Sequence, residues 1–224
     1  MRAALGRTAF LVASLLVAAC TVAVHAAERQ TMPIEAIHSG DITRLRAAID
    51  AGADLEARDG QGRTALLLAV HADAVEAAKL LIQAGADVNA KDAIKDTPFL
   101  YAGAEGRNEI LKAILASGRA DLKDTNRYGG TALIPAAHHG HPETVRILLG
   151  TDIDIDHVND LGWTALLEAV ILGDGGPVHR RIVGLLVDAG AKNSPDRDGR
   201  TPLDHARAMG FREMADRIAA GPRR

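Results

Sequence analysis

The chain has 224 residues and a formal net charge of −3 at pH 7. This slightly acidic balance, without a basic stripe, argues against nucleic acid as a partner. Aromatic residues make up only 3% of the chain, which is low for a globular core but suits an extended core of alanine and leucine. The single cysteine excludes an internal disulfide bond.

Residues 1–26 have the pattern of an export signal, because Arg2 and Arg7 precede an uncharged apolar run and small residues follow it. In a second interpretation, the segment Val-Ala-Ala-Cys resembles a bacterial lipobox, so that Cys20 would be lipidated and become the first residue. A third interpretation is an uncleaved anchor, although the run is slightly short for a hydrocarbon layer of about 30 Å. All three place the remaining chain outside the cytoplasm, where a chain without further cysteines suits an oxidising compartment.

After a linker at residues 27–32, the chain repeats with a period of 33 residues, as the spacing of Gly52, Gly85 and Gly118 shows. Each copy is expected to begin with a polar turn and a threonine that caps a short helix. These threonines are Thr64, Thr97, Thr131, Thr164 and Thr201. A second helix follows, with Ala77, Leu80 and Leu81 on its apolar side in the second copy, and a glycine ends it. Two such short helices cannot bury their apolar sides alone, so the copies must stack.

The repeated segments resemble those of the ankyrin-repeat family. They are TALLLAV (64–70), TPFLYAG (97–103), TALIPAA (131–137), TALLEAV (164–170) and TPLDHAR (201–207). Tails such as QAGADVNAKD (83–92) complete the pattern. The resemblance covers residues 33–221 and implies an all-α solenoid of about six helix–turn–helix repeats. The expected repeats are 33–58, 59–91, 92–125, 126–158, 159–195 and 196–221.

Some positions depart from the regular pattern. The first repeat lacks the usual opening, as expected for an end repeat whose outer flank faces water. Asp73 and Lys95 stand where other repeats have glycine, and lysine is expected to strain its turn. Asp152 stands in for the glycine that ends a helix. An insertion of about five residues within 174–181 is expected to form a surface loop, which is a candidate site of contact with a partner.

The sequence contains no catalytic constellation, because its serines lack a nucleophile context and no glycine-rich phosphate motif is present. We therefore expect a non-enzymatic protein without a cofactor. The resemblance implies a module that binds a protein partner, and we expect it to be a monomer. The leader pattern and the absence of further cysteines predict that this module lies in the bacterial periplasm, is secreted, or is an outer-membrane lipoprotein. A membrane would be contacted only through the N-terminal anchor. An alternative is an exported effector that binds host proteins.

The resemblance also implies that the partner binds the concave side, at the turn tips and the exposed ends of the first helices. By register, the tips are Gln61, Arg63, Ile94, Asp96, Arg127, Tyr128, Leu161, Trp163, Asp198 and Arg200. The helix-end positions are His38, His71, Glu105, His138, His139, Ile171 and Leu172. Because aromatic and arginine side chains dominate binding hot spots, we expect Tyr128, Trp163 and Arg127 to form one patch with Leu161. Arg63, His71, His138, His139 and Ile171 complete the expected set. The alternative is that the aromatic residues only cover neighbouring turns.

The histidines at 138, 139 and 141 support a different hypothesis, a stress-related periplasmic protein that binds a metal or small ligand. The family resemblance implies a structural role for His141, while His138 and His139 occupy variable positions. Neighbouring repeats stack about 8–10 Å apart, whereas zinc requires each ligand nitrogen at about 2 Å. Histidines from different repeats are therefore not expected to share a metal ion.

Overall fold

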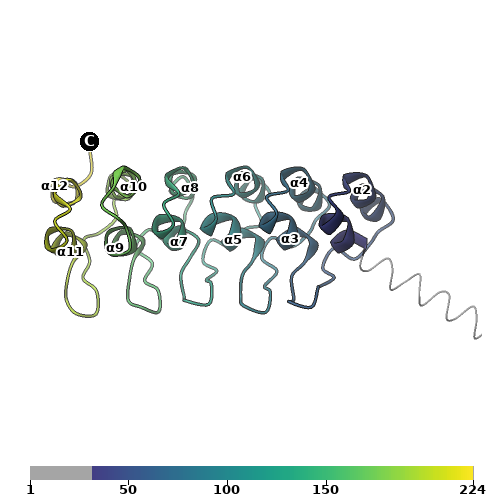
Figure 1. Ribbon diagram of the computed structural model, residues 1–224, viewed down its shortest axis with the longest axis horizontal. Coiled ribbons are helices and arrows are strands. Elements are labelled where there is room, and N and C mark those ends of the chain that lie inside the picture. The colour runs from purple at the N-terminus through teal and green to yellow at the C-terminus, as the bar shows by residue number, and fades with distance from the viewer. Residues whose placement is uncertain (1–31, 224) are drawn as a thin grey trace, which may run out of the picture.

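The computed structural model describes residues 32–223, which form a row of helical hairpins in two layers (Figure 1). The outer helices are α2 (Ile42–Asp50), α4 (Val75–Gln83), α6 (Asn108–Ala116), α8 (Pro142–Leu148), α10 (Pro177–Asp188) and α12 (Arg212–Ala220). The inner helices are α3 (Ala65–His71), α5 (Pro98–Ala104), α7 (Leu133–His138), α9 (Ala165–Ile171) and α11 (Pro202–Ala208). Residues 32–39 are also helical. The predicted all-α solenoid is confirmed, whereas the predicted export signal and Cys20 lie outside the described residues.

The apolar core runs along the whole row, because each inner helix packs on the inner helices of its neighbours, α3 on α5, α5 on α7, α7 on α9 and α9 on α11. This stacking gives seven-residue helices a stability that they would lack alone. In α4, Leu81 is fully buried but Leu80 is only partly buried. The sequence pattern had treated the two leucines as equivalent. Among the described residues, no helix combines the length and apolar character needed to cross a membrane.

The long turns between repeats project beyond the inner helices (Figure 1) and share one set of hydrogen bonds. In each turn, a side-chain oxygen of the first residue accepts from the backbone N–H groups two and four residues later. These first residues are Asp59, Asp92, Asn126, Asn159 and Asp196. The bonds are local and fix the residue at each tip, namely Gln61, Ile94, Tyr128, Leu161 and Asp198. The tips are therefore rigidly presented.

Four of the five predicted threonine caps are present, since Thr64, Thr97, Thr164 and Thr201 accept from the backbone N–H three residues later. The prediction is wrong for Thr131, whose buried hydroxyl has no partner. The cause is Pro135, which has no N–H to donate to the Thr131 carbonyl. That carbonyl accepts from the N–H of Ile134 instead, at 3.2 Å, and α7 starts only at Leu133.

Asp73 and Lys95 adopt positive φ angles of 51° and 67°, as expected for residues in glycine positions. The prediction for Asp152 is wrong, because this residue has no positive φ. Helix α8 ends at Leu148, whose carbonyl accepts from both the backbone N–H and the hydroxyl of Thr151, at 3.0 and 2.6 Å. These bonds satisfy the end of the helix without a left-handed residue.

The insertion within 174–181 was expected to form a surface loop, and this prediction is only partly right. Helix α10 begins at Pro177 and has 12 residues, compared with nine in α4 and α6. The additional residues therefore lengthen both the loop before α10 and the helix itself. Asp174 fixes the loop by accepting from the N–H of Gly176 at 2.8 Å.

Candidate binding site

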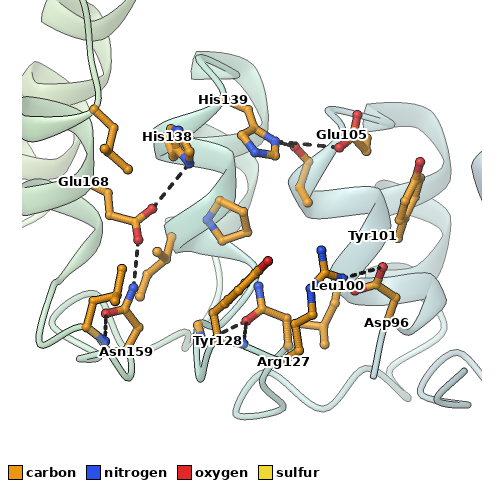
Figure 2. Close-up of a pocket in the computed structure, with 17 residues that line it drawn as sticks. Asp96, Leu100, Tyr101, Glu105, Arg127, Tyr128, His138, His139, Asn159 and Glu168 are labelled. Atoms are coloured by element: carbon orange, nitrogen blue, oxygen red, sulfur yellow. Dashed lines mark hydrogen bonds and ion pairs between the residues drawn. The ribbon is translucent and has the colours of Figure 1, made fainter. Parts of the chain in front are cut away.

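A pocket of about 480 Å³ lies between the turn tips and the inner helices of three successive hairpins (Figure 2). Its walls come from α5, α7 and α9 and from the turns at 126–130 and 159–161. The volume is within the range of about 300–1,000 Å³ that is usual for ligand sites. The floor includes Leu100 and Ile134, which are both 3% exposed. The pocket therefore combines an apolar floor with polar walls.

Five of the predicted binding residues line this pocket, namely Arg127, Tyr128, Leu161, His138 and His139. The guanidinium carbon of Arg127 lies 4.8 Å from the centre of the Tyr128 ring, and its Nη1 lies 3.9 Å from Oδ2 of Asp96. These two contacts hold Arg127 at the rim (Figure 2).

Three further tip and helix-end positions, Asp96, Glu105 and Leu172, also line the pocket, whereas the other four residues of the expected binding set do not. Trp163 and Ile171 are half-buried and lie outside it. Arg63 is held by Asp59 within its own turn, with Nε 2.8 Å from Oδ2. His71 lies beside the pocket without lining it, because its ring stacks on Tyr101 with the ring centres 3.7 Å apart. Of the four residues of the expected patch, Arg127, Tyr128 and Leu161 thus line the pocket and Trp163 does not.

Glu168 is the central pocket residue that the sequence reasoning missed. It lies on α9 with 6% of its surface exposed, and Nδ2 of Asn159 donates to its Oε1 at 2.7 Å. Its Oε2 lies 3.7 Å from Nδ1 of His138. Burial raises the pKa of Glu168, although the hydrogen bond from Asn159 and the charge of His139 act in the opposite direction. A charged residue within the apolar segment TALLEAV was the signal that could have identified it.

The Asn159–Glu168 pair has a counterpart in the last repeat. Asp196 and His205 occupy the equivalent positions, and there the histidine Nε2 lies 2.7 Å from the aspartate Oδ2. The amide of Asn159 carries both an acceptor and donors. Its Oδ1 accepts from the backbone N–H of Leu161 in the turn, and its Nδ2 donates to Glu168. An aspartate at position 159 could not donate to Glu168.

The remaining charged groups make the pocket acidic. Burial and the negative charge of Asp92 raise the pKa of Asp96, against the effect of Arg127. Glu105 lies 3.7 Å from Nδ1 of His139. Burial, His139 and His179 lower the pKa of His138, so this imidazole favours its neutral form at pH 7. The pocket therefore presents the carboxylates of Asp96, Glu105 and Glu168 but the single guanidinium of Arg127.

The histidines at 138, 139 and 141 do not converge on a common point in the described structure. Within residues 32–223, no three histidine, cysteine or acidic side chains are arranged to hold a metal ion. The ring centres of His139 and His141 lie 6.3 Å apart, and Nδ1 of His139 bonds to the carbonyl of Ala104 at 2.8 Å. The His141 ring packs so closely on Gly106 that a Cβ there would lie 2.8 Å from its Nδ1. His141 is therefore structural, as the family resemblance implied.

The comparisons with known proteins agree with this architecture. The family model for ankyrin repeats (three copies) matches residues 1–92 and 93–159. The putative ankyrin repeat protein YahD of Escherichia coli (strain K12) is 40% identical over 189 residues, covering 83% of this chain and 94% of YahD. An ankyrin repeat domain from Acinetobacter baumannii AYE aligns with a TM-score of 0.82 and 50% identity, covering 85% of this chain and 97% of the domain. The ankyrin repeat domain of Bcl-3 aligns with a TM-score of 0.77 and 28% identity, over 86% and 87% of the two chains. The chain belongs to the ankyrin-repeat family.

Proposed function

We propose that this protein is a non-enzymatic module that binds a partner protein on the side of its turn tips and inner helices, outside the bacterial cytoplasm. Ankyrin repeats are a protein–protein interaction module. The observation that carries the proposal is an apolar row, which we define as Ile94, Tyr128 and Leu161, at equivalent tips of three successive turns. Their exposed fractions are 50%, 56% and 52%. Neighbouring exposed apolar side chains of this kind mark interaction surfaces.

The opposite face of the molecule has a different character. The outer helices carry exposed ion pairs such as Arg46–Glu76, Lys112–Glu109 and Arg146–Glu143. Such pairs stay well hydrated and offer little apolar area to a partner. This contrast favours the row and the pocket beneath it as the binding face.

The turn tips are suited to a folded partner because their conformation is already fixed. The side-chain oxygens of Asn126 and Asn159 each accept hydrogen bonds from two backbone N–H groups, in the turns that carry Tyr128 and Leu161 respectively. A preformed surface of this kind loses little conformational entropy on binding.

The proposed location outside the cytoplasm is supported by the leader pattern of residues 1–26 alone. Replacing Cys20 with alanine tests whether the protein is a lipoprotein or a cleaved secretory protein. A lipoprotein would move from the membrane fraction to the soluble periplasmic fraction, whereas a cleaved secretory protein would not change its distribution. Recovery of the intact leader on cytosolic protein would contradict the proposal.

The binding face is tested by affinity capture from periplasmic extract with the Tyr128→Ala/Leu161→Ala variant. We expect it to lose a partner that the wild type retains, because hot-spot truncations typically weaken binding by about 30-fold or more. The control is Glu109→Ala/Lys112→Ala on the outer face, which should retain the partner. Equal recovery of every partner by both variants would refute the assigned face.

A further inference from the structure

We propose that the pocket beneath the apolar row receives an arginine side chain of the partner protein, with Glu168 as the carboxylate that binds its guanidinium. This inference rests on the proposed function for the source of the arginine. It goes further by assigning the chemistry of one partner residue and the site that it occupies.

The carboxylate of Glu168 lacks a full set of hydrogen-bond partners within the described residues. A carboxylate can accept about four hydrogen bonds, but among the described residues only Asn159 donates to the side-chain carboxylate of Glu168. His138 lies 3.7 Å from Oε2, which is too long for a hydrogen bond. A nearly buried carboxylate without a cation is unfavourable unless a charged group can reach it. Glu168 therefore has an open position on Oε2 that a cationic donor would satisfy.

The guanidinium that lines the pocket does not fill this open position on Glu168. Arg127 is the guanidinium that lines the pocket, and Asp96 and the ring of Tyr128 hold it at the rim. Figure 2 shows Glu168 directed toward Asn159 and His138, on the other side of Tyr128 from Asp96. Arg127 is thus engaged on the α5 side, and the carboxylate of Glu168 on α9 has no guanidinium beside it within the described residues, which favours a positively charged ligand there.

The walls of the pocket suit an arginine side chain in shape and polarity. Leu100, Ile134 and Leu172 offer apolar contact for an alkyl chain, and Tyr101 and Tyr128 offer aromatic rings. Among cationic side chains, arginine fits such a site better than lysine. Its guanidinium is less strongly hydrated, stacks on aromatic rings and donates two parallel hydrogen bonds to one carboxylate.

The test uses acetyl-Leu-Arg-Leu-amide as the probe, titrated into the purified full-length chain and followed by calorimetry and by amide NMR spectra. Peptides with lysine or glutamine at the central position serve as comparisons. We expect roughly millimolar binding of the arginine peptide, as is usual for ligands of this size, with shift changes centred on α7 and α9. The glutamine peptide should bind about 10-fold more weakly or worse, and the lysine peptide should fall between them.

The variant is Glu168→Gln, which keeps an oxygen for the Asn159 hydrogen bond but removes the charge. It should weaken binding of the arginine peptide by about 10-fold or more, since hydrogen bonds to charged groups are the strong ones. The control is Glu109→Gln, a fully exposed carboxylate on the outer face, which should leave binding unchanged. Circular dichroism of both variants verifies the fold.

Three results would overturn the inference. They are equal affinities for the arginine and glutamine peptides, unchanged binding by Glu168→Gln, and shift changes away from α7 and α9. Free agmatine that binds as tightly as the arginine peptide would overturn the assignment to a protein side chain.

The outcomes separate this inference from the proposed function. If the peptide fails but Tyr128→Ala/Leu161→Ala loses its partner, the binding face stands and the arginine assignment falls. If the peptide binds at Glu168 but that double variant retains every partner, the guanidinium site stands and the assigned binding face falls.

Discussion

Replacing Lys95 with glycine should stabilise the protein. Lys95 has a φ of 67°, whereas the equivalent positions in four other turns hold glycines with φ between 72° and 86°. A left-handed conformation costs an L-residue about 1–2 kcal/mol, and glycine itself loses about 0.5–1 kcal/mol more backbone entropy on folding than alanine does. The expected net gain in the free energy of unfolding is therefore about 0.5–1 kcal/mol. No ion pair of Lys95 within residues 32–223 offsets this gain.

The close spacing of some neighbouring turns bears on the side chain at this position. The N–H of Ala93 donates to the carbonyl of Gln61 at 3.1 Å, and the N–H of Asp160 donates to that of Tyr128 at 3.0 Å. The described structure has no equivalent bond between the turn of Lys95 and the next turn. At the glycine of the preceding turn, Gly62, an added Cβ would lie 3.1 Å from the backbone nitrogen of Ala93. Where two turns lie this close, a Cβ on the first would crowd the second; the turn of Gly162, however, lacks the bond to its successor as well.

The assay is urea unfolding followed by circular dichroism, with thermal unfolding as a second measurement. For a domain of this size, the gain corresponds to an increase in Tm of about 1–4 °C. Lys123→Gly is the matched control, because Lys123 is exposed but has no positive φ, and it should lose about 0.5–1 kcal/mol. Asp73→Gly should raise the free energy of unfolding by less than Lys95→Gly does, since it also removes the ion pair between Asp73 and Arg107. A stability of Lys95→Gly at or below that of the wild type would refute the reasoning.

Three further predictions follow from burial and packing. Leu81→Ala should lower the free energy of unfolding by about 2–5 kcal/mol because Leu81 is fully buried, whereas Leu80→Ala should lower it by only about 1–2 kcal/mol. Equal losses in urea unfolding would mean that the buried side of α4 is misassigned. Gly103→Ala should cost about 1–3 kcal/mol, since its Cβ would lie 2.8 Å from that of Ala132, and an unchanged midpoint of unfolding would contradict this close contact. Glu168→Gln should be more stable than the wild type at pH 7, because burial raises the folded-state pKa of Glu168 and thus disfavours its charged form. This stability advantage should disappear as the pH falls through that folded-state pKa, because the wild-type carboxyl then takes up a proton. Urea unfolding on a roughly unit-spaced pH series between pH 4 and 8 measures the advantage. An advantage that is constant with pH would contradict the prediction.

The repeat architecture could be predicted because its main interactions are local in the sequence. The aspartate or asparagine that opens each turn bonds to groups two and four residues away, and each capping threonine bonds three residues away. Such short-range bonds depend only on residue type and spacing. The sequence also identified Tyr128, Arg127 and Leu161 as tip residues, since register alone places them there.

Local exceptions were harder to predict because they depend on a second residue. Thr131 is in register as a cap, but Pro135 removes the N–H that the first helical turn requires. Asp152 is in register with a helix-ending glycine, but the hydroxyl of Thr151 ends that helix in another way. In both cases the repeat pattern was correct, and a neighbouring side chain changed the outcome.

The sequence by itself thus determined the stack of hairpins and the order of its tips, because the necessary hydrogen bonds form within each repeat. Only the tertiary structure decided which tips share a pocket, that Trp163 is outside it, and that Glu168 lines it beside His138. These relations join side chains about one and two repeats apart, and they depend on how the hairpins pack. A period in the sequence specifies that neighbours touch, but the direction of each side chain and its burial follow from the assembled stack.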